Sequence, residues 1–575
     1  MRAHIVPVLC TALLPFPATA QSTTRAHVAT SGLPGNGSAF DSQLSSDGRW
    51  LLIQSSSTNL GGAVRGLPWS NVWLHDRMTG TTSLVSVAID GGPANQASSV
   101  QGGPRLVSPD GRLVLFTSVA SNLVASDLTP MPDVFVRDMV TGITAMASTN
   151  AAGAQANGQS IHPCFTGDAR AIVFESSATN LVTGDSNAAT DVFVKDVVTD
   201  AVELVSVSSS GAQADAACVR PRISSDGRWV CFVGLATNLV PGDTNGMSDV
   251  FLRDRSLGTT ERVSVTASGL QANSFSDFGS VSDDGSRVMF FSGSSNLVPN
   301  DANGLDDFFV RDRAVSTTIR VNISTNGAEA TLQSQDGTLS ADGRWALFAS
   351  DAPNLVPNDG NGSLDVFRYD LQTGIQARLS VSSVGHEATG DSRTPRASAN
   401  GSVVSFVSGA VDLIAGDANH VGDVFVRDLP STAAPVTSYC TAKTSSSGCV
   451  PAIGTSGIAS ATAGDNFRLC TGMVPPSVNG VFFWGVTAAA VPFGGGTLCI
   501  APPVVRSPVQ NSGVGHVPIA GCSGATAWAL TCAELQSHGV VPGEDVHAQY
   551  WYRDAGFTPP NNVGLTDAVT FRFEP

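Results

Sequence analysis

Short runs of β-branched and aromatic residues, separated by turn-forming residues, recur along most of the chain. In one stretch such runs cover residues 220–224, 228–234, Asp249–Asp254 and 260–265, with tight turns at 225–227 and 256–259. Runs of this length, bounded by Asp-Gly and Leu-Gly, are typical of hairpin-connected strands. The pattern therefore predicts a unit of four short antiparallel strands.

This unit recurs seven times. The segment Asp-Val-Phe-Leu-Arg-Asp at Asp249–Asp254 has counterparts at Asp133–Asp138, Asp191–Asp196, Asp307–Asp312, Asp365–Asp370 and Asp423–Asp428, and a degenerate copy at Asn71–Asp76. The first interval is 62 residues and the other five are 58. A second landmark, mostly Asp-Gly, keeps step at Asp47, Asp110, Asp168, Asp226, Asp284, Asp342 and Asn400. Seven four-stranded units predict an all-β, seven-bladed β-propeller, because each blade buries its faces against its neighbours.

The phase of the repeat predicts how the ring closes. The seventh unit stops after its third strand, Asp423–Asp428, whereas residues 23–30 match the fourth strand of a unit, as at 259–266. The N-terminal strand is therefore expected to complete the last blade, which leaves no unpaired edge. The long loops between second and third strands and the connections between blades would then share one rim.

The first 20 residues combine a positive start, a short apolar stretch and the small-x-small pattern of Ala18, Thr19 and Ala20. This pattern predicts a signal peptide cleaved near Ala20, and a protein that is secreted, periplasmic or on the cell surface. No later apolar stretch approaches the length of about 18 residues that a membrane-spanning helix needs.

Composition agrees with an exported β protein and excludes two classes of partner. The 575 residues exceed one ordinary core, and 59 glycines with 31 prolines suit many tight turns. The formal charge is −17, with lysine only at Lys195 and Lys443. Nucleic acids and anionic membranes are poor partners for such a surface, since binding them needs clustered Lys and Arg.

The repeat ends near residue 430 and cysteines then become frequent. We expect a propeller at 21–430, a linker at 431–437 and a cysteine-rich β-domain, sandwich-like, at 438–575. Candidate strands of that domain lie at 467–471, 480–487, 496–501, 546–553 and 568–573. Six cysteines (Cys440, Cys449, Cys470, Cys499, Cys522 and Cys532) are compatible with three disulfides, in any of 15 pairings. Cys164, Cys218 and Cys231 form an odd set, so at least one is expected to be a small buried hydrophobe.

Two resemblances carry expectations of their own. The repeated Ser-x-Asp-Gly-Arg followed by Asp-Val-Phe-Val-Arg-Asp resembles the WD40-like PD40 repeats of TolB-like propellers over about residues 22–430. It implies the propeller architecture and no particular activity. Residues 438–575, with Tyr439-Cys-Thr-Ala-Lys, Trp551-Tyr-Arg-Asp and Gly564-Leu-Thr-Asp, resemble a domain found at the ends of exported planctomycete proteins. No activity follows from that resemblance.

The loop before each third strand is the candidate cation site. Its pattern is Asp-x-Asn-Gly-x-x-Asp, strict or looser, at Asp243, Asn245, Asp249; Asp301, Asn303, Asp307; Asp359, Asn361, Asp365; Asp185, Asn187, Asp191; and Asp417, Asn419, Asp423. The second unit keeps only Asp127 and Asp133. Two carboxylates, an amide oxygen and nearby carbonyls suit Ca²⁺, and extracellular calcium is plentiful enough to fill weak sites. Alternatively, Asp and Asn stabilise the turn through the backbone with no metal bound.

The sequence specifies no catalytic chemistry and no organic cofactor. It lacks a Gly-x-Ser-x-Gly nucleophile elbow, a His-Glu-x-x-His and a Cys-x-x-Cys. The leading interpretation is a secreted, monomeric binding or scaffold propeller that holds an unknown protein or glycan on its long-loop rim. The alternatives are a carbohydrate-active enzyme, a lyase or glycosidase with its site in the channel, and a structural component of the cell surface. An enzyme should break the repeat with Arg, His, Tyr or Asp at channel-facing positions, and a binding platform should be irregular only in its loops.

Overall fold

The computed structural model describes residues 21–61, 69–324, 326–417, 419 and 421–429, and shorter segments between residues 437 and 573. The chain divides into two compact units, one spanning Ala20–Leu429 and the other beginning at Pro430. The expected signal peptide at 1–20 and nearly all of the expected linker at 431–437 lie outside the described residues. No helix of the described segments is long and apolar enough to cross a membrane.

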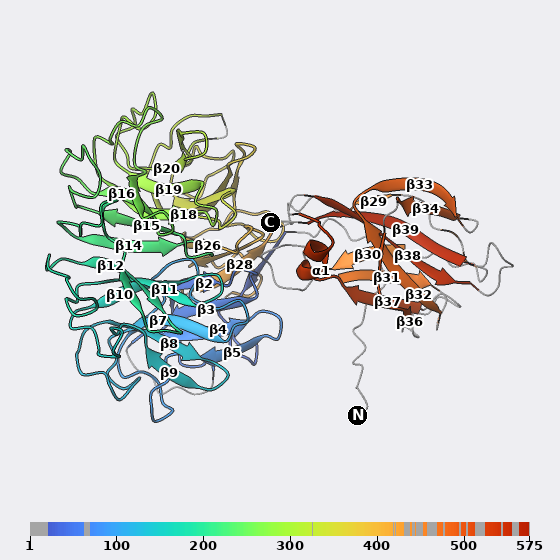
Figure 1. The fold of residues 1–575 in the computed structure, drawn as a ribbon, viewed down its shortest axis with the longest axis horizontal. Helices are drawn as coiled ribbons and strands as arrows, with labels where there is room; N and C mark the ends of the chain where they lie inside the picture. The colour runs from blue at the N-terminus through green and yellow to red at the C-terminus, as the bar shows by residue number, and fades with distance from the viewer. Residues whose placement is uncertain are drawn as a thin grey trace. The chain divides into compact units, whose positions relative to one another are not determined.

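The first unit is built from seven four-stranded antiparallel sheets, the blades of a propeller (Figure 1). Blade 1 contains β2 (Ala39–Leu44), β3 (Trp50–Ser55), β4 (Asn71–Asp76) and β5 (Thr81–Leu84). Blade 2 contains β6 (Ser98–Ser99), β7 (Leu113–Ser118), β8 (Asp133–Asp138) and β9 (Ile143–Met146). Blade 3 contains β10 (Ser160–Phe165), β11 (Ala171–Ser176), β12 (Asp191–Asp196) and β13 (Val202–Leu204). Blade 4 contains β14 (Cys218–Ile223), β15 (Trp229–Gly234), β16 (Asp249–Asp254) and β17 (Thr259–Arg262).

The remaining blades follow the same plan. Blade 5 contains β18 (Ser276–Val281), β19 (Arg287–Ser292), β20 (Asp307–Asp312) and β21 (Thr317–Arg320). Blade 6 contains β22 (Ser334–Leu339), β23 (Trp345–Ser350), β24 (Asp365–Asp370) and β25 (Gln376–Arg378). Blade 7 contains β26 (Ser392–Ala397), β27 (Val403–Ser408) and β28 (Asp423–Asp428), and its fourth strand is β1 (Ser22–Arg25).

The N-terminal strand closes the ring, as the sequence predicts. β1 pairs antiparallel with β28, with Ser22 opposite Asp428 and Arg25 opposite Phe425. The first strands of neighbouring blades lie beside one another from β10 to β26, and β26 lies beside β2. These first strands therefore surround the central channel. The predicted seven blades and their closure are confirmed.

The predicted strands of blade 4 agree with the structure except at their ends. The first strand begins two residues earlier than predicted, at Cys218. The fourth strand ends at Arg262 rather than at residue 265. After Arg262 one more bond to the third strand follows, from Val263 N–H to the carbonyl of Val250, and Val265 then forms a single bridge to Gln271 in the connection to blade 5. Backbone groups of residues near Val265 are therefore paired with the connection to blade 5 and not with the third strand of blade 4.

Each blade repeats the same internal contacts, which explains the landmarks in the sequence. Phenylalanines of the second and third strands stack in six blades, with ring centroids 5.6–6.0 Å apart. In blade 4, Ser224 Oγ donates to Asp226 Oδ1 across the Asp-Gly turn, and Arg228 pairs with Asp254 at 2.7 Å. The Asp-Gly-Arg segment and the last Asp of the third-strand motif therefore have structural roles, and together they join the first three strands of the blade at the turn end.

The glycine of the Asp-Gly turn supports the neighbouring blade, which gives a stability prediction. Gly285 has φ +68, and a Cβ there would lie 2.4 Å from the Trp229 ring. Gly269 has φ +82, and a Cβ there would have nothing within 4 Å of it. Both Gly→Ala substitutions meet the left-handed penalty of about 1–2 kcal/mol, but only Gly285→Ala also overpacks, by about a further 1–3 kcal/mol. Urea denaturation of the two variants tests the difference, and equal losses would contradict the packing role.

The C-terminal unit is also mainly β. Its sheets contain β29 (Thr437–Tyr439), β39 (Val563–Arg572), β38 (Asp545–Arg553), β32 (Asn479–Gly485), β35 (Val505–Arg506) and β36 (Gln510–Asn511); β30 (Ala452–Ser456), β31 (Arg468–Val474) and β37 (Gly524–Ala529); and β33 (Ala488–Phe493) and β34 (Gly496–Ile500). All five predicted strand regions are strands, with shifted ends. Buried residues of the first two sheets, such as Phe482, Tyr550 and Leu469, share one core.

A short helix, α1 (Cys532–Ser537), was not predicted, although Thr531 and Glu534 form a capping signal in the sequence. Cys440, Cys449 and Cys522 lie outside the described residues, so the three disulfides stay a prediction. Cys164, Cys218 and Cys231 are free and buried, which confirms the expectation of a buried hydrophobic role. Burial raises the pKa of Cys231 to about 12, which keeps its thiol protonated and unreactive.

Candidate functional site

The Asp/Asn loops precede the third strand of their blades, and each asparagine holds the turn. Asn245 Oδ1 accepts from the backbone N–H of Met247 at 2.9 Å, and its Nδ2 donates to the carbonyl of Ala272 at 3.0 Å. The corresponding bonds recur at Asn187, Asn303, Asn361 and Asn419. The amide oxygens therefore serve the turn, as in the metal-free alternative.

The two aspartates of each loop do come together, but in blades 4 to 7 an arginine lies against both. Its Nη1 lies 2.8–3.3 Å from a carboxylate oxygen of each aspartate. The four groups are Arg262 with Asp243 and Asp249; Arg320 with Asp301 and Asp307; Arg378 with Asp359 and Asp365; and Arg25 with Asp417 and Asp423. A guanidinium thus supplies the positive charge that the sequence pattern alone would assign to calcium.

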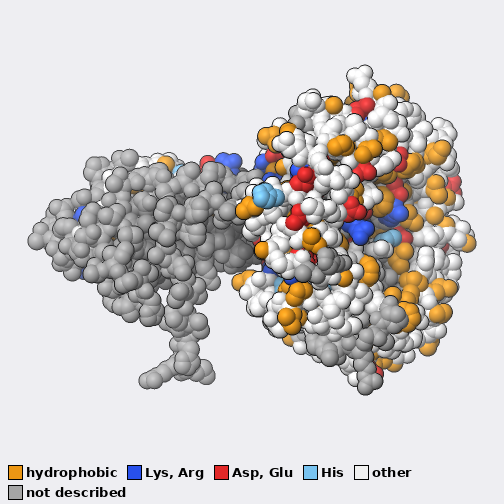
Figure 2. All heavy atoms as spheres, turned by 180° about the vertical axis from the view of Figure 1, so that it is seen from behind, with side chains coloured by type: hydrophobic (Ala, Val, Ile, Leu, Met, Phe, Trp, Pro, Cys, Tyr) orange, Lys and Arg blue, Asp and Glu red, His pale blue; other side chains and the backbone are white. Residues whose placement is uncertain are grey.

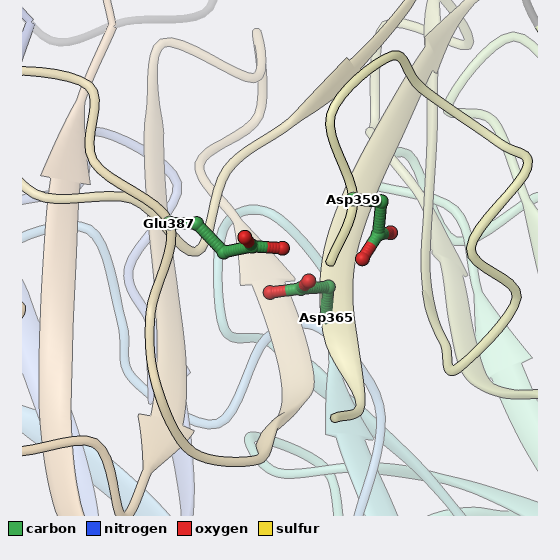
Figure 3. Close-up of side chains that lie close together, drawn as sticks. All are labelled: Asp359, Asp365 and Glu387. Atoms are coloured by element: carbon green, nitrogen blue, oxygen red, sulfur yellow. The ribbon is translucent and has the colours of Figure 1, made fainter. Parts of the chain in front are cut away.

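A third carboxylate joins this group in blades 5 and 6, Glu329 at Arg320 and Glu387 at Arg378. In blade 6 the three carboxylates also lie close to one another (Figure 3). Carboxylate oxygens of Asp359, Asp365 and Glu387 all lie within 4.8 Å of one another, and Arg378 Nη1 contacts all three side chains. Burial and the charge of Asp365 raise the pKa of Asp359 to about 6, although Arg378 acts in the opposite direction. Three carboxylates around one arginine leave a surplus of negative charge, which favours one bound proton.

That surplus predicts a pH-dependent gain in stability for Asp359→Asn. The folded-state pKa of Asp359 lies above its unfolded value of 3.8, so ionising it costs stability as pH rises from about 4 to about 6. The variant should therefore melt at a higher temperature than the wild type at pH 7.5, and at the same temperature near pH 4. Asp243→Asn in blade 4 is the control, because only two carboxylates lie against Arg262 there. A gain that is equal at both pH values would contradict the prediction.

Blade 3 keeps the aspartates without the arginine, because Leu204 takes its place in β13. Gln213 Nε2 donates to Asp185 Oδ1 at 2.8 Å and to Asp191 Oδ2 at 3.0 Å. Asp185 Oδ2 is buried and has no hydrogen-bond partner among the described residues. Blade 2 is similar, with Gln155 between Asp127 and Asp133.

The first strands of five blades share an unusual feature at the channel. Each has a β-bulge whose residue lies in the left-handed region, with φ between 50 and 55, at positions 58 residues apart. These bulge residues are His162, Arg220, Phe278, Asp336 and Thr394. Strained backbone of this kind in residues other than glycine gathers at functional sites. The left-handed backbone conformation recurs at the same position in each of these blades, but the residue at that position differs every time. The side chains carried by the bulges therefore differ in charge and polarity.

A cavity of about 80 Å³ lies in the channel beside this wall. Its lining comes from six blades: Gln43; Gly102, Gly103 and Pro104; Arg220 and Arg222; Phe278, Gly279 and Ser280; Asp336, Gly337 and Thr338; and Arg396. Figure 2 shows basic and acidic side chains together near the middle of the propeller face in view. The cavity is small, but several polar side chains converge on it, which is a feature of ligand sites.

The three arginines of the lining differ in their partners. Arg220 pairs with Asp277, and its guanidinium carbon lies 4.1 Å from the ring centroid of Phe278. Arg396 pairs with Asp41 at 3.2 Å. Arg222 forms no ion pair within the described residues, and its one hydrogen bond there, at 2.8 Å, is to the carbonyl of Pro221. Burial lowers the pKa of Arg222, as expected for a guanidinium taken out of water.

Gln43 completes the wall as a buried amide without partners. Its residue is 1 % exposed, and neither Nε2 nor Oε1 has a hydrogen-bond partner among the described residues. Gln43 occupies in β2 the register that Arg222 occupies in β14, since they pair with Leu52 and Cys231 at equivalent places in the second strands. Such groups are rare in native proteins because each unmade hydrogen bond is destabilising.

Arg105 crosses the channel at the end nearer the Asp-Gly turns. Its Nε donates to the carbonyl of Phe165 at 3.0 Å, its Nη2 to the carbonyl of Ile223, and its Nη1 to Asp283 at 3.0 Å. A second cavity, of about 20 Å³, lies on the turn side and includes Ser46 in its lining. Arg105 therefore links the inner strands of blades 3 and 4 to the turn that follows the inner strand of blade 5. The larger cavity lies nearer the long-loop rim, where the inner strands begin.

A Ser–His–Asp arrangement lies elsewhere, at the closure of the ring. His27 Nδ1 is 2.6 Å from Asp423 Oδ1, and Nε2 is 2.8 Å from Ser55 Oγ and 3.1 Å from Ser57 Oγ. His27 is fully buried, and all three partners are at most 1 % exposed. No substrate reaches these atoms, so the arrangement joins blades 7 and 1 rather than performing catalysis.

None of the channel residues was among the sites predicted from the sequence. The signal was present, because positions 162, 220, 278, 336 and 394 lie one repeat apart and hold five different residue types. Recognising these residues as a site requires knowing which inner-strand positions face the channel. The bulge changes which positions do so, because it shifts the pairing of the first strand with the second. The criterion stated for an enzyme, Arg, His or Asp breaking the repeat at the channel, is therefore met by His162, Arg220 and Asp336.

No family model and no curated protein matches the chain. Among solved structures, an oligogalacturonate lyase in complex with manganese is 13 % identical, with a TM-score of 0.43, over 71 % of this chain and 93 % of that one. The β-propeller domain of the Trilobed protease from Pyrococcus furiosus is 9 % identical, with a TM-score of 0.43, over 68 % and 95 %. A TolB from Agrobacterium tumefaciens is 13 % identical, with a TM-score of 0.31, over 50 % and 80 %. Similarities at this level carry no argument about family, ligand or reaction.

Proposed function

We propose that this chain is a secreted binding propeller whose ligand enters the central channel from the long-loop rim. One observation carries the proposal: the structural positions of the repeat are kept from blade to blade, whereas the strained channel positions differ in every blade that has them. Side chains that only had to pack would follow the repeat. Their variation around the channel cavity favours a site for one asymmetric ligand.

Loss of the exposed aromatic at this site tests the proposal. Phe278 lines the cavity and is 42 % exposed, so Phe278→Ala should weaken binding without unfolding the blade. Leu257→Ala is the control, since Leu257 is 70 % exposed in a turn outside the channel. An array of neutral and acidic glycans and small metabolites, probed with both variants and the wild type, should give hits that only Phe278→Ala reduces. Hits that Phe278→Ala leaves unchanged would place the ligand outside the channel.

A carbohydrate-active enzyme is the second candidate, and the same cavity favours it. Asp336 lines the cavity, and His162 Nδ1 lies 3.1 Å from Glu175 Oε2 next to Arg220. Carboxylates and a histidine at the inner strands of a propeller can serve as acid and base. Incubating each array hit with the wild type and analysing the products by mass spectrometry separates the two candidates, because a binding protein returns the ligand unchanged.

We restrict the calcium proposal to blade 3. Asp185 and Asp191 lie together there without an arginine, and one buried carboxylate oxygen of Asp185 has no partner among the described residues. Extracellular sites of this kind bind at about 10⁻⁴–10⁻³ M, so millimolar calcium should raise the melting temperature of the wild type relative to chelator. Asp185→Asn should remove that rise and Asp243→Asn in blade 4 should not. An unchanged melting temperature in the wild type would end the calcium proposal.

A further inference from the structure

We propose that Gln21 is a modification site. Once the signal peptide is cleaved after Ala20, the α-amino group of Gln21 attacks its own side-chain amide and forms pyroglutamate, and Arg427 promotes this reaction. The inference rests on the cleavage site predicted from the sequence. It is independent of the proposed function, because the lining of the channel cavity includes neither Gln21 nor Arg427.

Gln21 occupies the place of a turn residue that blade 7 lacks. In blade 4, Arg253 Nη1 donates to the carbonyl of Gly258, the residue immediately before β17, at 2.9 Å. The fourth strand of blade 7 is β1, which comes from the N-terminal segment and has no such turn before it. There Arg427 Nη2 donates to Oε1 of Gln21, the residue immediately before β1. The side-chain amide therefore replaces the turn carbonyl as a partner of the arginine.

Arg427 is held in place by acceptors that carry no charge. The residue is 3 % exposed, and its Nη1 donates to Thr23 Oγ1 at 2.7 Å and to the carbonyls of Val381 at 3.0 Å and Ser382 at 3.3 Å. Its partners among the described residues include no carboxylate. A buried guanidinium without a counter-ion acts strongly on any charge that develops beside it, because little water screens the interaction.

The contact between Arg427 and Oε1 places the cation where the reaction develops negative charge. The lone pair of the α-amino nitrogen forms a bond to Cδ, and Oε1 carries the negative charge of the tetrahedral intermediate, which Arg427 Nη2 stabilises. The bond from Cδ to Nε2 then breaks, one amine proton passes to that nitrogen, and ammonia leaves. Oε1 becomes the carbonyl oxygen of the lactam and remains an acceptor for Nη2. The ring contains only atoms of Gln21, so β1 does not have to move.

The modification also removes a charge from the chain end. A free α-amino group is largely protonated at neutral pH, so it would add a second cation near the uncompensated charge of Arg427. The carboxylate of Asp428, the residue opposite Ser22, is already paired with Arg77 at 2.7 Å. The lactam is neutral, and it leaves no free amine for an aminopeptidase at the start of the strand that closes the ring.

The test follows the N-terminus of the full chain by mass spectrometry. The secreted protein should begin at residue 21 and be lighter than the uncyclised chain by one ammonia. A fusion whose cleavage exposes Gln21 on the folded protein gives the cyclisation rate, and a synthetic peptide of residues 21–28 gives the rate without the fold. The folded chain should cyclise roughly tenfold or more faster than the peptide, because one well-placed donor to a developing oxyanion has at least that effect.

Two arginine variants separate this role from a structural one. Arg427→Met should reduce the cyclisation rate of the folded chain to that of the peptide. Arg253→Met is the matched control, because Arg253 makes the equivalent contacts in blade 4, and it should leave the rate at Gln21 unchanged. Circular dichroism shows whether each variant is folded. If Arg427→Met does not fold, the comparison of the wild type with the peptide decides by itself.

An N-terminus at another residue, or an uncyclised Gln21 in the secreted protein, would overturn the inference. So would a folded chain that cyclises no faster than the peptide, or a folded Arg427→Met variant that cyclises as fast as the wild type. None of these results would affect the proposed channel function, which is tested at Phe278.

Discussion

Replacing His27 by leucine should lower the free energy of unfolding by about 3–5 kcal/mol. His27 lies in the N-terminal segment that completes blade 7, and its ring nitrogens contact Asp423 in that blade and Ser55 in blade 1. Leucine removes these contacts and leaves the fully buried carboxylate of Asp423 with less compensation. Because the closing segment holds the first and last blades together, the loss should affect the whole ring. Urea denaturation followed by tryptophan fluorescence measures it.

The other blades provide a matched control for this prediction. At the position equivalent to His27 they hold a residue that bonds the first residue of the third strand: Ser86, Ser148, Ser206, Ser264, Asn322 and Ser380. His27→Ser should therefore retain a bond to Asp423 and lose less stability than His27→Leu. If the two variants were equally stable, the buried carboxylate would not be the source of the effect.

Replacing Arg378 by methionine should be similarly destabilising, by about 3–5 kcal/mol at pH 7.5. The arginine side chain is 11 % exposed and is the cation beside Asp359, Asp365 and Glu387. Without it, three carboxylates face one another, and their pKa values should rise above the present ones. Stability lost in this way returns as pH falls, because protonation removes the repulsion, so the deficit should shrink between pH 7.5 and pH 5.

An exposed pair shows what a less buried arginine contributes. The side chain of Arg112 is 50 % exposed and pairs with Asp138 at 2.8 Å, so Arg112→Met should change the melting temperature little at either pH. If the stability that Arg378→Met loses at pH 7.5 were still fully lost at pH 5, the cause would be lost packing of the side chain and not uncompensated charge.

The Asp/Asn loops show which parts of a site a sequence pattern can predict and which it cannot. The spacing identified carboxylates that do lie together, such as Asp243 and Asp249. It could not show the partner, because Arg262 lies 13 residues after Asp249, in the next strand of the blade. Antiparallel pairing of β16 with β17 brings that arginine over the loop. A metal-like pattern and an internal ion pair therefore have the same local sequence.

The sequence by itself determined the number of blades, their four-strand plan and the closure of the ring by the N-terminal strand. These follow from local features that repeat, namely alternating apolar runs, Asp-Gly turns such as Asp226-Gly227, and the phase of the unit, so they need no knowledge of distant contacts. Only the tertiary structure decided which side chains meet in the channel. Gln43, Arg222 and Arg396 are separated by more than a hundred residues and come from three blades, and the inner-strand bulges set which of their neighbours face inward. The physical reason is that closure of the ring, and not any local pattern, brings the first strands of all the blades around one axis.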